Sequence, residues 1–257
     1  MEKSNGPAVD KMEPPHWWNG GTGREFVLVL YGPKLSDCTV STEEPRLTVL
    51  ANERREHEDF LFVRMRVEPG CTEGIKSLTL TDAKDRATPL SFPIHDARLR
   101  PVGGQGIESG STLYLIMPDR FANGDPSNDT VEGLREQGVD RSEMYARHGG
   151  DLQGIAQHVD YLDALGVDAL WLNPVLLNDQ PKASYHGYAV TDNYQVDPRL
   201  GGNAAYRDMV AGCHEKDIRV IQDVIFNHWG HNHWMVRELP DSSWLHQWPE
   251  FTLTNYN

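Results

Sequence analysis

The chain has 257 residues, 39% of them hydrophobic, which is enough for one large domain or two ordinary ones. Its 38 acidic and 24 basic residues give a formal net charge of −14, which disfavours nucleic acid and anionic membranes as partners and suits a neutral ligand or a cation. No apolar run approaches the ~20 residues of a membrane span. The three cysteines, Cys38, Cys71 and Cys213, are too widely spaced for a disulfide framework or a zinc site.

Residues 1–13 are polar, contain Pro and Gly and show no periodicity, so we expect a disordered N-terminus without the apolar core of a signal peptide. Within the predicted domain of residues 14–103, the period is two from Glu25 to about Ile94, as in the run LFVRMRV at residues 61–67. Strands at roughly 12-residue spacing, separated by turns, predict an all-β immunoglobulin-like sandwich. The Gly-rich residues 104–110 are predicted to be a linker.

Strand and helix patterns alternate from residue 111 to the third predicted strand, which predicts a parallel sheet with helical crossovers. Short strands are expected at 113–117, 169–172 and 219–225. The first predicted helix has one apolar face formed by Leu152, Ile155, Val159 and Leu162. Asn203 is predicted to cap the second, whose apolar face holds Tyr206, Met209, Val210 and Cys213. Residues 111–257 are therefore expected to form the first part, about three β/α units, of a (β/α)8 TIM barrel.

The run VIQDVIFNHWG, residues 220–230, combines an apolar strand with polar groups at its carboxyl end. It reads as a strand buried on both faces that delivers Asp223, Asn227 and His228. An α/β barrel builds its active site in this way. The sequence therefore predicts a functional site at the carboxyl ends of these strands.

Five ordered runs in this part of the chain resemble the α-amylase superfamily, glycoside hydrolase family 13. They are YLIMPDRFANGDPSND, HGGDLQGI, GVDALWLNPV, YHGYAVTDNYQVDPRLGG and DVIFNH. The opening PPHWWNGG is similar to that of the neopullulanase and cyclomaltodextrinase group, whose members carry a β-sandwich ahead of the barrel. The resemblance implies a calcium-binding glycosidase of starch degradation and carbohydrate metabolism.

The resemblance implies a retaining α-glycoside hydrolase acting on α-1,4 glucans, namely cyclodextrins, pullulan and malto-oligosaccharides. Its nucleophile Asp and acid/base Glu are expected beyond Asn257, so the chain is expected to be an inactive N-terminal fragment. Three strands of an open parallel sheet would expose an apolar edge and a bare face, so we expect the isolated chain to aggregate or to bind a complementary piece. A transglycosylase of the same family and a non-catalytic carbohydrate-binding module are the alternatives. The resemblance is compatible with a homodimer of the parent protein. It favours a periplasmic location, and a cytoplasmic location is the alternative.

The loop NGDPSND, residues 123–129, is a candidate Ca²⁺ site because it clusters the hard oxygen ligands that this cation prefers. A plain Asx- and Gly-rich turn is the alternative interpretation. The four side chains that offer oxygens are Asn123, Asp125, Asn128 and Asp129. The resemblance implies that the carbonyl of Gly149 and the side chain of Asp151 complete the shell.

The resemblance also implies substrate-binding roles. Tyr188 matches the aromatic ring on which family members stack the substrate sugar, His228 matches a donor to a sugar hydroxyl, and His186 matches a neighbouring polar residue. Asp223 and Asn227 match scaffold residues. His231 and His233 lack a carboxylate partner and helical spacing, so zinc is not expected there. Three tryptophans, Trp17, Trp18 and Trp171, are expected to pack structurally, although Trp17 and Trp18 could instead form a sugar platform.

Overall fold

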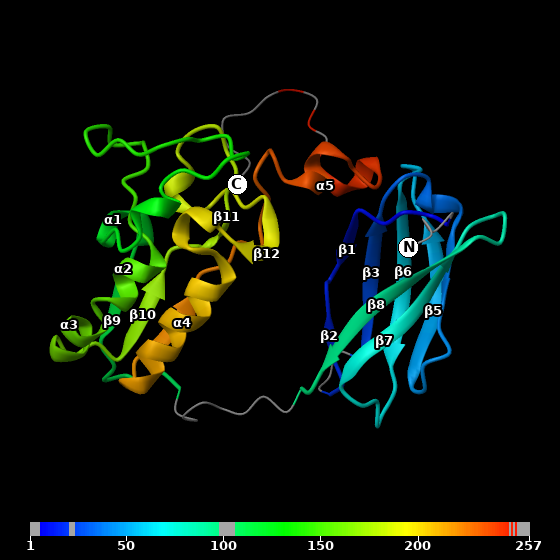
Figure 1. Ribbon diagram of the computed structural model, residues 1–257, viewed down its shortest axis with the longest axis horizontal. Helices are drawn as coiled ribbons and strands as arrows, with labels where there is room; N and C mark the ends of the chain where they lie inside the picture. The colour runs from blue at the N-terminus through cyan, green and yellow to red at the C-terminus, as the bar shows by residue number, and fades with distance from the viewer. Residues whose placement is uncertain (1–5, 21–23, 98–105, 247, 249, 251–257) are drawn as a thin grey trace. The chain divides into compact units, whose positions relative to one another are not determined.

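The computed structural model describes the chain except residues 1–5, 21–23, 98–105, 247, 249 and 251–257. The chain divides into two compact units (Figure 1). One comprises Met1–Arg100 with Glu238–Asn257, and the other comprises Pro101–Arg237. Among the described residues, none of the helices has the length and apolar character needed to cross a membrane.

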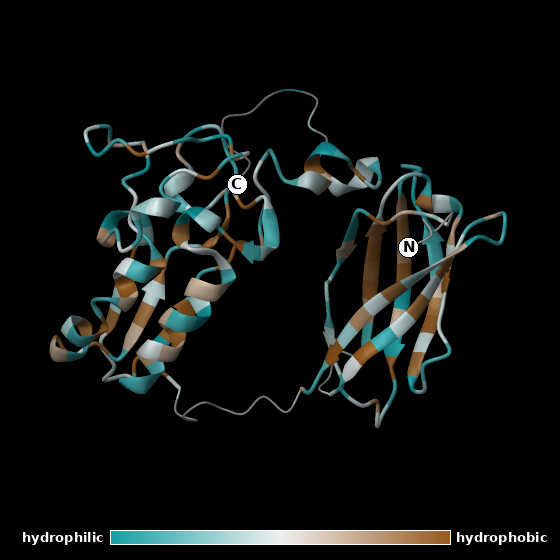
Figure 2. Ribbon diagram, viewed as in Figure 1, coloured by the Kyte–Doolittle hydropathy of each residue, from teal (hydrophilic) through white to brown (hydrophobic). Residues whose placement is uncertain are grey.

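The first unit is a β-sandwich of two four-stranded sheets. One sheet has the order β1 (Lys11–Glu13), β3 (Glu25–Tyr31), β6 (Phe60–Val67) and β5 (Leu47–Arg54). The other has the order β2 (Trp17–Trp18), β8 (Ala87–His95), β7 (Gly74–Thr81) and β4 (Thr39–Ser41). Both sheets turn alternate apolar side chains inward, so that Leu28, Val63, Leu78 and Phe92 are fully buried in one core. Figure 2 shows this concentration of hydrophobic residues along β3.

Two expectations for this unit are corrected. Lys11–Glu13, placed in the disordered N-terminus, form β1, since their backbone pairs with the edge of β3 and Met12 packs on the core. Described residues from Glu238 onward, expected in the barrel, belong to the sandwich unit: Pro240 O accepts from His57 N at 3.1 Å, and the ring of Trp244 lies 5.7 Å from that of Phe62. Two 3-10 helices, Leu35–Asp37 and Ser242–Trp244, also belong here.

The second unit contains a three-stranded parallel sheet of order β13 (Arg219–Gln222), β10 (Ala169–Leu172) and β9 (Leu113–Ile116). The three strands are in register, so Ile116, Leu172 and Gln222 lie in one row at their carboxyl ends. Three helices, α2 (Leu152–Ala156), α3 (Val159–Ala164) and α4 (Gly202–Glu215), pack their apolar residues on the sheet in one buried cluster. This is the arrangement of successive β/α units.

The remaining elements follow the carboxyl ends of the strands. They are α1 (Pro118–Phe121), η2 (Pro126–Asn128), β11 (Leu176–Leu177), η3 (Ser184–His186), β12 (Asp192–Val196), η4 (Pro198–Leu200) and α5 (Trp234–Arg237). β11 and β12 form a short antiparallel ribbon. The candidate site residues of this unit lie in these elements or in the loops that connect them, as expected when loops on a rigid scaffold supply the functional groups.

Both predicted helices differ in detail from the structure. The first is divided into α2 and α3, because His158 leaves the helical backbone (φ −112°, ψ 11°) and its Nδ1 lies 2.7 Å from Gly154 O. Asn203 is not the cap of the second, which begins after Gly201 with φ 99°. Asn203 lies within α4, where its Oδ1 accepts from Val196 N at 2.8 Å and ties the helix to β12.

The third strand and Trp171 also differ from the predictions. β13 ends at Gln222 rather than residue 225, and its residues are half-buried or exposed rather than buried on both faces. Trp171, expected in the barrel core, is 43% exposed beside Leu115 on β9, because both side chains point away from the helices. The alternation along β10, with Leu170 and Leu172 buried, determines which face each residue takes.

Candidate sugar-binding and cation sites

The predicted sugar-binding residues come together after β10 and β13. The hydroxyl of Tyr188 donates to Asp223 Oδ2 at 3.0 Å, which joins the long loop after β10 to the end of β13. Burial raises the pKa of Tyr188, and the hydrogen bond to Asp223 and the charge of that carboxylate raise it further. Tyr188 is nevertheless 40% exposed. Asp223 therefore fixes the hydroxyl while much of the residue faces solvent.

His186 supports Tyr188 from its other side. The two rings stack at 5.9 Å with an interplanar angle of 28°, and His186 Nδ1 accepts from Tyr188 N at 2.9 Å. Gly187 between them has φ +81°, and a Cβ there would collide with the carbonyl of Pro174. Burial lowers the pKa of His186, which favours the neutral ring that can accept this backbone hydrogen bond.

His228 lies directly against the same segment. Its Nε2 is 3.0 Å from Tyr188 O, and its Nδ1 is 3.3 Å from Asn227 Nδ2. Because an amide nitrogen only donates, Nδ1 accepts and Nε2 carries the proton that is given to the carbonyl. Asn227 and the carbonyl of Tyr188 thus select the tautomer of His228.

The other predictions for aromatic and histidine residues have mixed outcomes. Trp17 stacks on Phe26 at 4.6 Å and packs against the sandwich core, whereas Trp18 is 39% exposed. His233 is fully buried and stacks on Trp229 at 4.3 Å. Within the described ranges, no three His, Cys, Asp or Glu side chains gather as a metal site would require.

Asp151 organises the predicted calcium loop. Its carboxylate is fully buried and accepts from Gly124 N, Asp125 N and Gly154 N at 3.1, 2.9 and 2.6 Å. It also accepts from Asn128 Nδ2 at 3.2 Å. The residue is the N-cap of α2, so one carboxylate ties the loop after β9 to the start of that helix.

The predicted ligand oxygens differ in whether they already accept hydrogen bonds. Asn123 Oδ1 and Asn128 Oδ1 are buried without a hydrogen-bond partner. Burial raises the pKa of Asp129; the hydrogen bond from Asn123 opposes this shift, and the negative charge of Asp151 adds to it. Asp125 Oδ1 instead accepts from Ser127 N at 3.0 Å and Ser127 Oγ at 2.6 Å. Two orphaned amide oxygens beside a destabilised carboxylate fit a hard cation, whereas the Asp125 and Asp151 side chains are already engaged.

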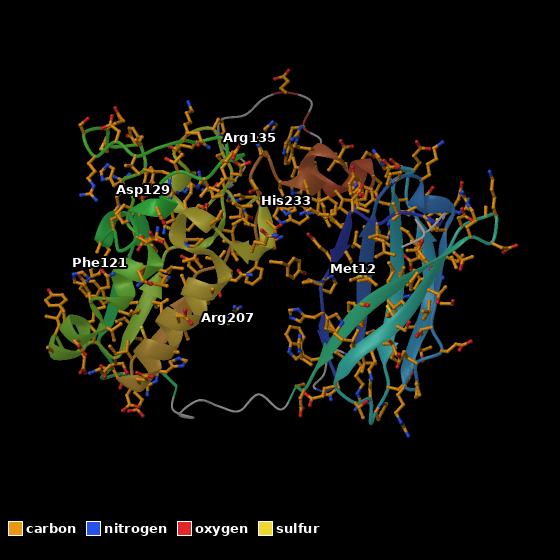
Figure 3. All side chains as sticks on the ribbon, in the orientation of Figure 1. Met12, Phe121, Asp129, Arg135, Arg207 and His233 are labelled. Carbon is orange, nitrogen blue, oxygen red and sulfur yellow. The ribbon has the colours of Figure 1, made fainter. Side chains whose placement is uncertain are left out.

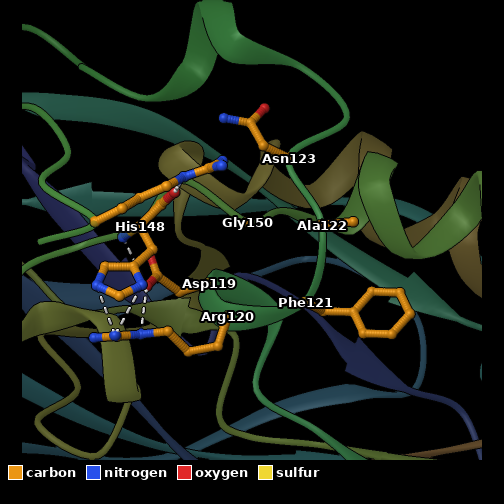
Figure 4. Close-up of a pocket in the computed structure, with 8 residues that line it drawn as sticks. Asp119, Arg120, Phe121, Ala122, Asn123, His148 and Gly150 are labelled. Atoms are coloured by element: carbon orange, nitrogen blue, oxygen red, sulfur yellow. Dashed lines mark hydrogen bonds and ion pairs between the residues drawn. The ribbon is translucent and has the colours of Figure 1, made fainter. Parts of the chain in front are cut away.

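Gly149 lies directly against the side chains of Asp129 and Asn123. Its φ is +84°, and a Cβ there would collide with Asp129 Oδ1. A pocket of about 340 Å³ lies alongside, and its lining includes Asn123, Arg141 and His148 (Figure 4). Figure 4 also shows Arg120 beneath His148, with Arg120 Nη1 2.8 Å from His148 Nε2.

The sequence analysis missed two ion pairs of these loops, each with a buried carboxylate. Asp119, the polar residue soon after β9, is 1% exposed, pairs with Arg120 at 3.0 Å and accepts from His148 N at 2.9 Å. Arg199 is fully buried and binds Asp197 through Nε and Nη2 at 2.9 and 2.7 Å. Burial would raise the pKa of Asp197, but the hydrogen bonds and charge of Arg199 lower it. The position of Asp119 soon after an apolar strand was a usable signal, whereas nothing local predicted a buried Arg199.

The comparisons with known proteins agree with this arrangement. Residues 115–253, more than half of the chain, match the family model for the alpha-amylase catalytic domain. The chain belongs to the alpha-amylase family. Residues 11–98 match the model for the N-terminal region of cyclomaltodextrinase. These matches confirm the resemblance and the predicted order of a β-sandwich followed by the first part of the family's barrel.

Relatives within the alpha-amylase family match over part of their length. The chain is 38% identical over 176 residues to a periplasmic alpha-amylase of Escherichia coli, covering 64% of the chain and 23% of the relative. It is 39% identical over 131 residues to a cyclomaltodextrinase of Thermoanaerobacter pseudethanolicus, covering 51% and 22%. The crystal structure of an alpha-amylase from Anoxybacillus superposes with a TM-score of 0.50 at 37% identity, covering 57% of the chain and 30% of that structure. The chain thus spans under a quarter of the length of these two curated relatives.

Proposed function

We propose that this chain supplies the sugar-binding rim of a retaining glycoside hydrolase that acts on α-1,4 glucans such as cyclodextrins, pullulan and malto-oligosaccharides. The observation that carries the proposal is the joined pair of Tyr188 and His228: the hydroxyl of Tyr188 is held by Asp223, and its carbonyl is held by His228. A half-exposed aromatic ring beside a histidine and an amide suits a neutral sugar, whose apolar face stacks and whose hydroxyls bond at the edge.

The reaction class comes from the family and the relatives rather than from a catalytic pair in this cluster. Retention requires two carboxylates ~5 Å apart, one as nucleophile and one as acid/base. Asp223 accepts the hydroxyl of Tyr188 at 3.0 Å, so it serves as a scaffold. The nucleophile and acid/base are therefore not assigned to any residue of this sequence. A transglycosylase would use the same rim and differ in whether water or a second sugar accepts the product.

We also propose that Ca²⁺ binds at the loop after β9. The side-chain oxygens of Asn123, Asn128 and Asp129 would hold it, together with the carbonyl of Gly149. When bound, the cation would neutralise the half-buried carboxylate of Asp129 and satisfy the two orphaned amide oxygens. Its role would be structural. It would stabilise the same loop that the hydrogen bonds of Asp151 link to the start of α2.

Calorimetric titration of the chain with maltoheptaose tests the sugar-binding role. We expect binding that Tyr188→Ala weakens at least tenfold, because the stacking platform is lost. Tyr161→Ala, which removes a 56% exposed tyrosine from α3, is the control and should bind as the wild-type chain does. Equal binding of a β-1,4-linked cello-oligosaccharide, or no effect of Tyr188→Ala, would contradict the proposal.

A non-catalytic binding module remains the second candidate, favoured by the hydrogen-bonded state of Asp223. Product analysis with pullulan and cyclodextrin on the longest form of the protein separates the two, since a module releases no sugar. Light scattering tests the predicted homodimer. We propose a periplasmic location, as the name of the Escherichia coli relative suggests for that protein, and cell fractionation distinguishes it from the cytoplasmic alternative.

A further inference from the structure

The loop that carries His228 is fastened along the segment that carries Tyr188 by a row of backbone and side-chain contacts. His228 Nε2 lies 3.0 Å from Tyr188 O, and Gly230 N donates to Val190 O at 2.7 Å. Two residues further along the loop, Asn232 Nδ2 donates to Gln180 Oε1 at 3.0 Å. The two halves of the proposed sugar site are therefore bound to each other by the main chain as well as by the end of the Tyr188 side chain.

Gly230 shows how closely the two segments approach. A Cβ at this position would collide with the carbonyl of Ala189 and with Gln180 Nε2. Its backbone does not require a left-handed conformation, so glycine is needed here for space. The loop can lie this close to Ala189 only while residue 230 has no side chain.

Gln180 bridges the two segments with both ends of its amide. Its Nε2 donates to Ala189 O at 3.3 Å, and its Oε1 accepts from Asn232 Nδ2 at 3.0 Å. The side chain is half-buried and does not form part of the Tyr188 platform. A side-chain amide can donate to a carbonyl and accept from a second amide at once, whereas a carboxylate can only accept.

The far end of the loop has a separate anchor. His233, labelled in Figure 3, is fully buried. It stacks on Trp229, and its Nε2 lies 3.4 Å from Asn193 Nδ2 on β12. Loss of Gln180 would therefore leave the loop attached at His233. The part that would loosen is the stretch between His228 and Asn232, which would keep the Gly230 N–Val190 O hydrogen bond but lose the Gln180 bridge.

We propose that Gln180 is a positioning residue of the sugar site, which sets the distance between the ring of Tyr188 and the imidazole of His228 by bridging Ala189 and Asn232. The inference rests on the proposed function, because its consequence is the affinity for an α-glucan. A stacked sugar contacts the Tyr188 ring and bonds to His228 at the same time, so loosening one relative to the other weakens both contacts.

The test measures the affinity of the whole chain for maltoheptaose by calorimetry. We expect Gln180→Ala to weaken binding about tenfold, and Gln180→Glu to weaken it as much, because a carboxylate accepts from Asn232 but cannot donate to Ala189 O. Gln153→Ala, which removes an exposed glutamine from α2, is the matched control and should not change the affinity. Circular dichroism shows whether each variant is folded. If Gln180→Ala does not fold, the affinity of Gln180→Glu provides the test.

A double-mutant cycle separates positioning from a general loss of structure. In a His228→Ala background, Gln180→Ala should weaken binding by less than twofold, because the contact that it positions is already absent. A full tenfold loss in that background would overturn the proposal, as would wild-type affinity in the Gln180→Ala single variant. If the wild-type chain does not bind maltoheptaose, the proposed function fails; if Tyr188→Ala weakens binding and Gln180→Ala does not, only this inference fails.

Discussion

Replacement of Asp151 by alanine should destabilise the second unit more than the loss of any surface carboxylate. The side chain is fully buried and accepts from three backbone N–H groups and from Asn128 Nδ2. Loss of the N-cap bond to Gly154 costs about 1 kcal/mol, and each further buried donor left without a partner costs ~1–3 kcal/mol. Because the loop donors can regain water, we expect a total of about 3–5 kcal/mol.

The assay is urea unfolding followed by far-ultraviolet circular dichroism, with a chelator present so that no bound cation contributes. The α-helical component of this signal reports the second unit, because α1 to α5 all lie within Pro101–Arg237. Asp160→Ala is the matched control: its side chain is 86% exposed and pairs only at the surface with Lys216, so little change is expected. Equal unfolding midpoints for Asp151→Ala and Asp160→Ala would refute the reasoning that the buried carboxylate holds the loop.

Three further predictions concern charge. Burial raises the pKa of Asp129 above its unfolded value near 4. The stability that this group contributes is therefore present below the unfolded pKa and is lost as the pH rises through the folded pKa. Asp129→Asn should raise the melting temperature at neutral pH in chelator and abolish the increase that calcium gives the wild-type chain. Asp223→Asn should bring the pKa of Tyr188 back toward 10 in a spectrophotometric titration, and an unchanged titration would exclude the hydroxyl–carboxylate contact. Arg199→Met should cost about 3–5 kcal/mol in urea unfolding, because it leaves Asp197 buried without its partner, and a loss below 1 kcal/mol would contradict this.

The sequence was sufficient to predict the elements that depend on periodicity. The alternation along β6 and β7 required one apolar face in each strand, and the spacing of Leu152, Ile155 and Leu162 required a helical face. It was less reliable where a local signal competed with a long-range one. Asn203 has the chemistry of a cap but bonds to Val196, and residues 11–13 have no periodicity but pair with β3.

The sequence by itself determined which chemical groups stand at the carboxyl ends of the strands: Tyr188, Asp223, Asn227 and His228 follow apolar runs in a fixed order. Only the tertiary structure decided how these groups are used. The hydroxyl of Tyr188 donates to the carboxylate of Asp223, and the carboxylate of Asp151 accepts from backbone N–H groups. The physical reason is that a hydrogen bond depends on distance and direction between atoms far apart in the chain, whereas a residue pattern records only type and spacing.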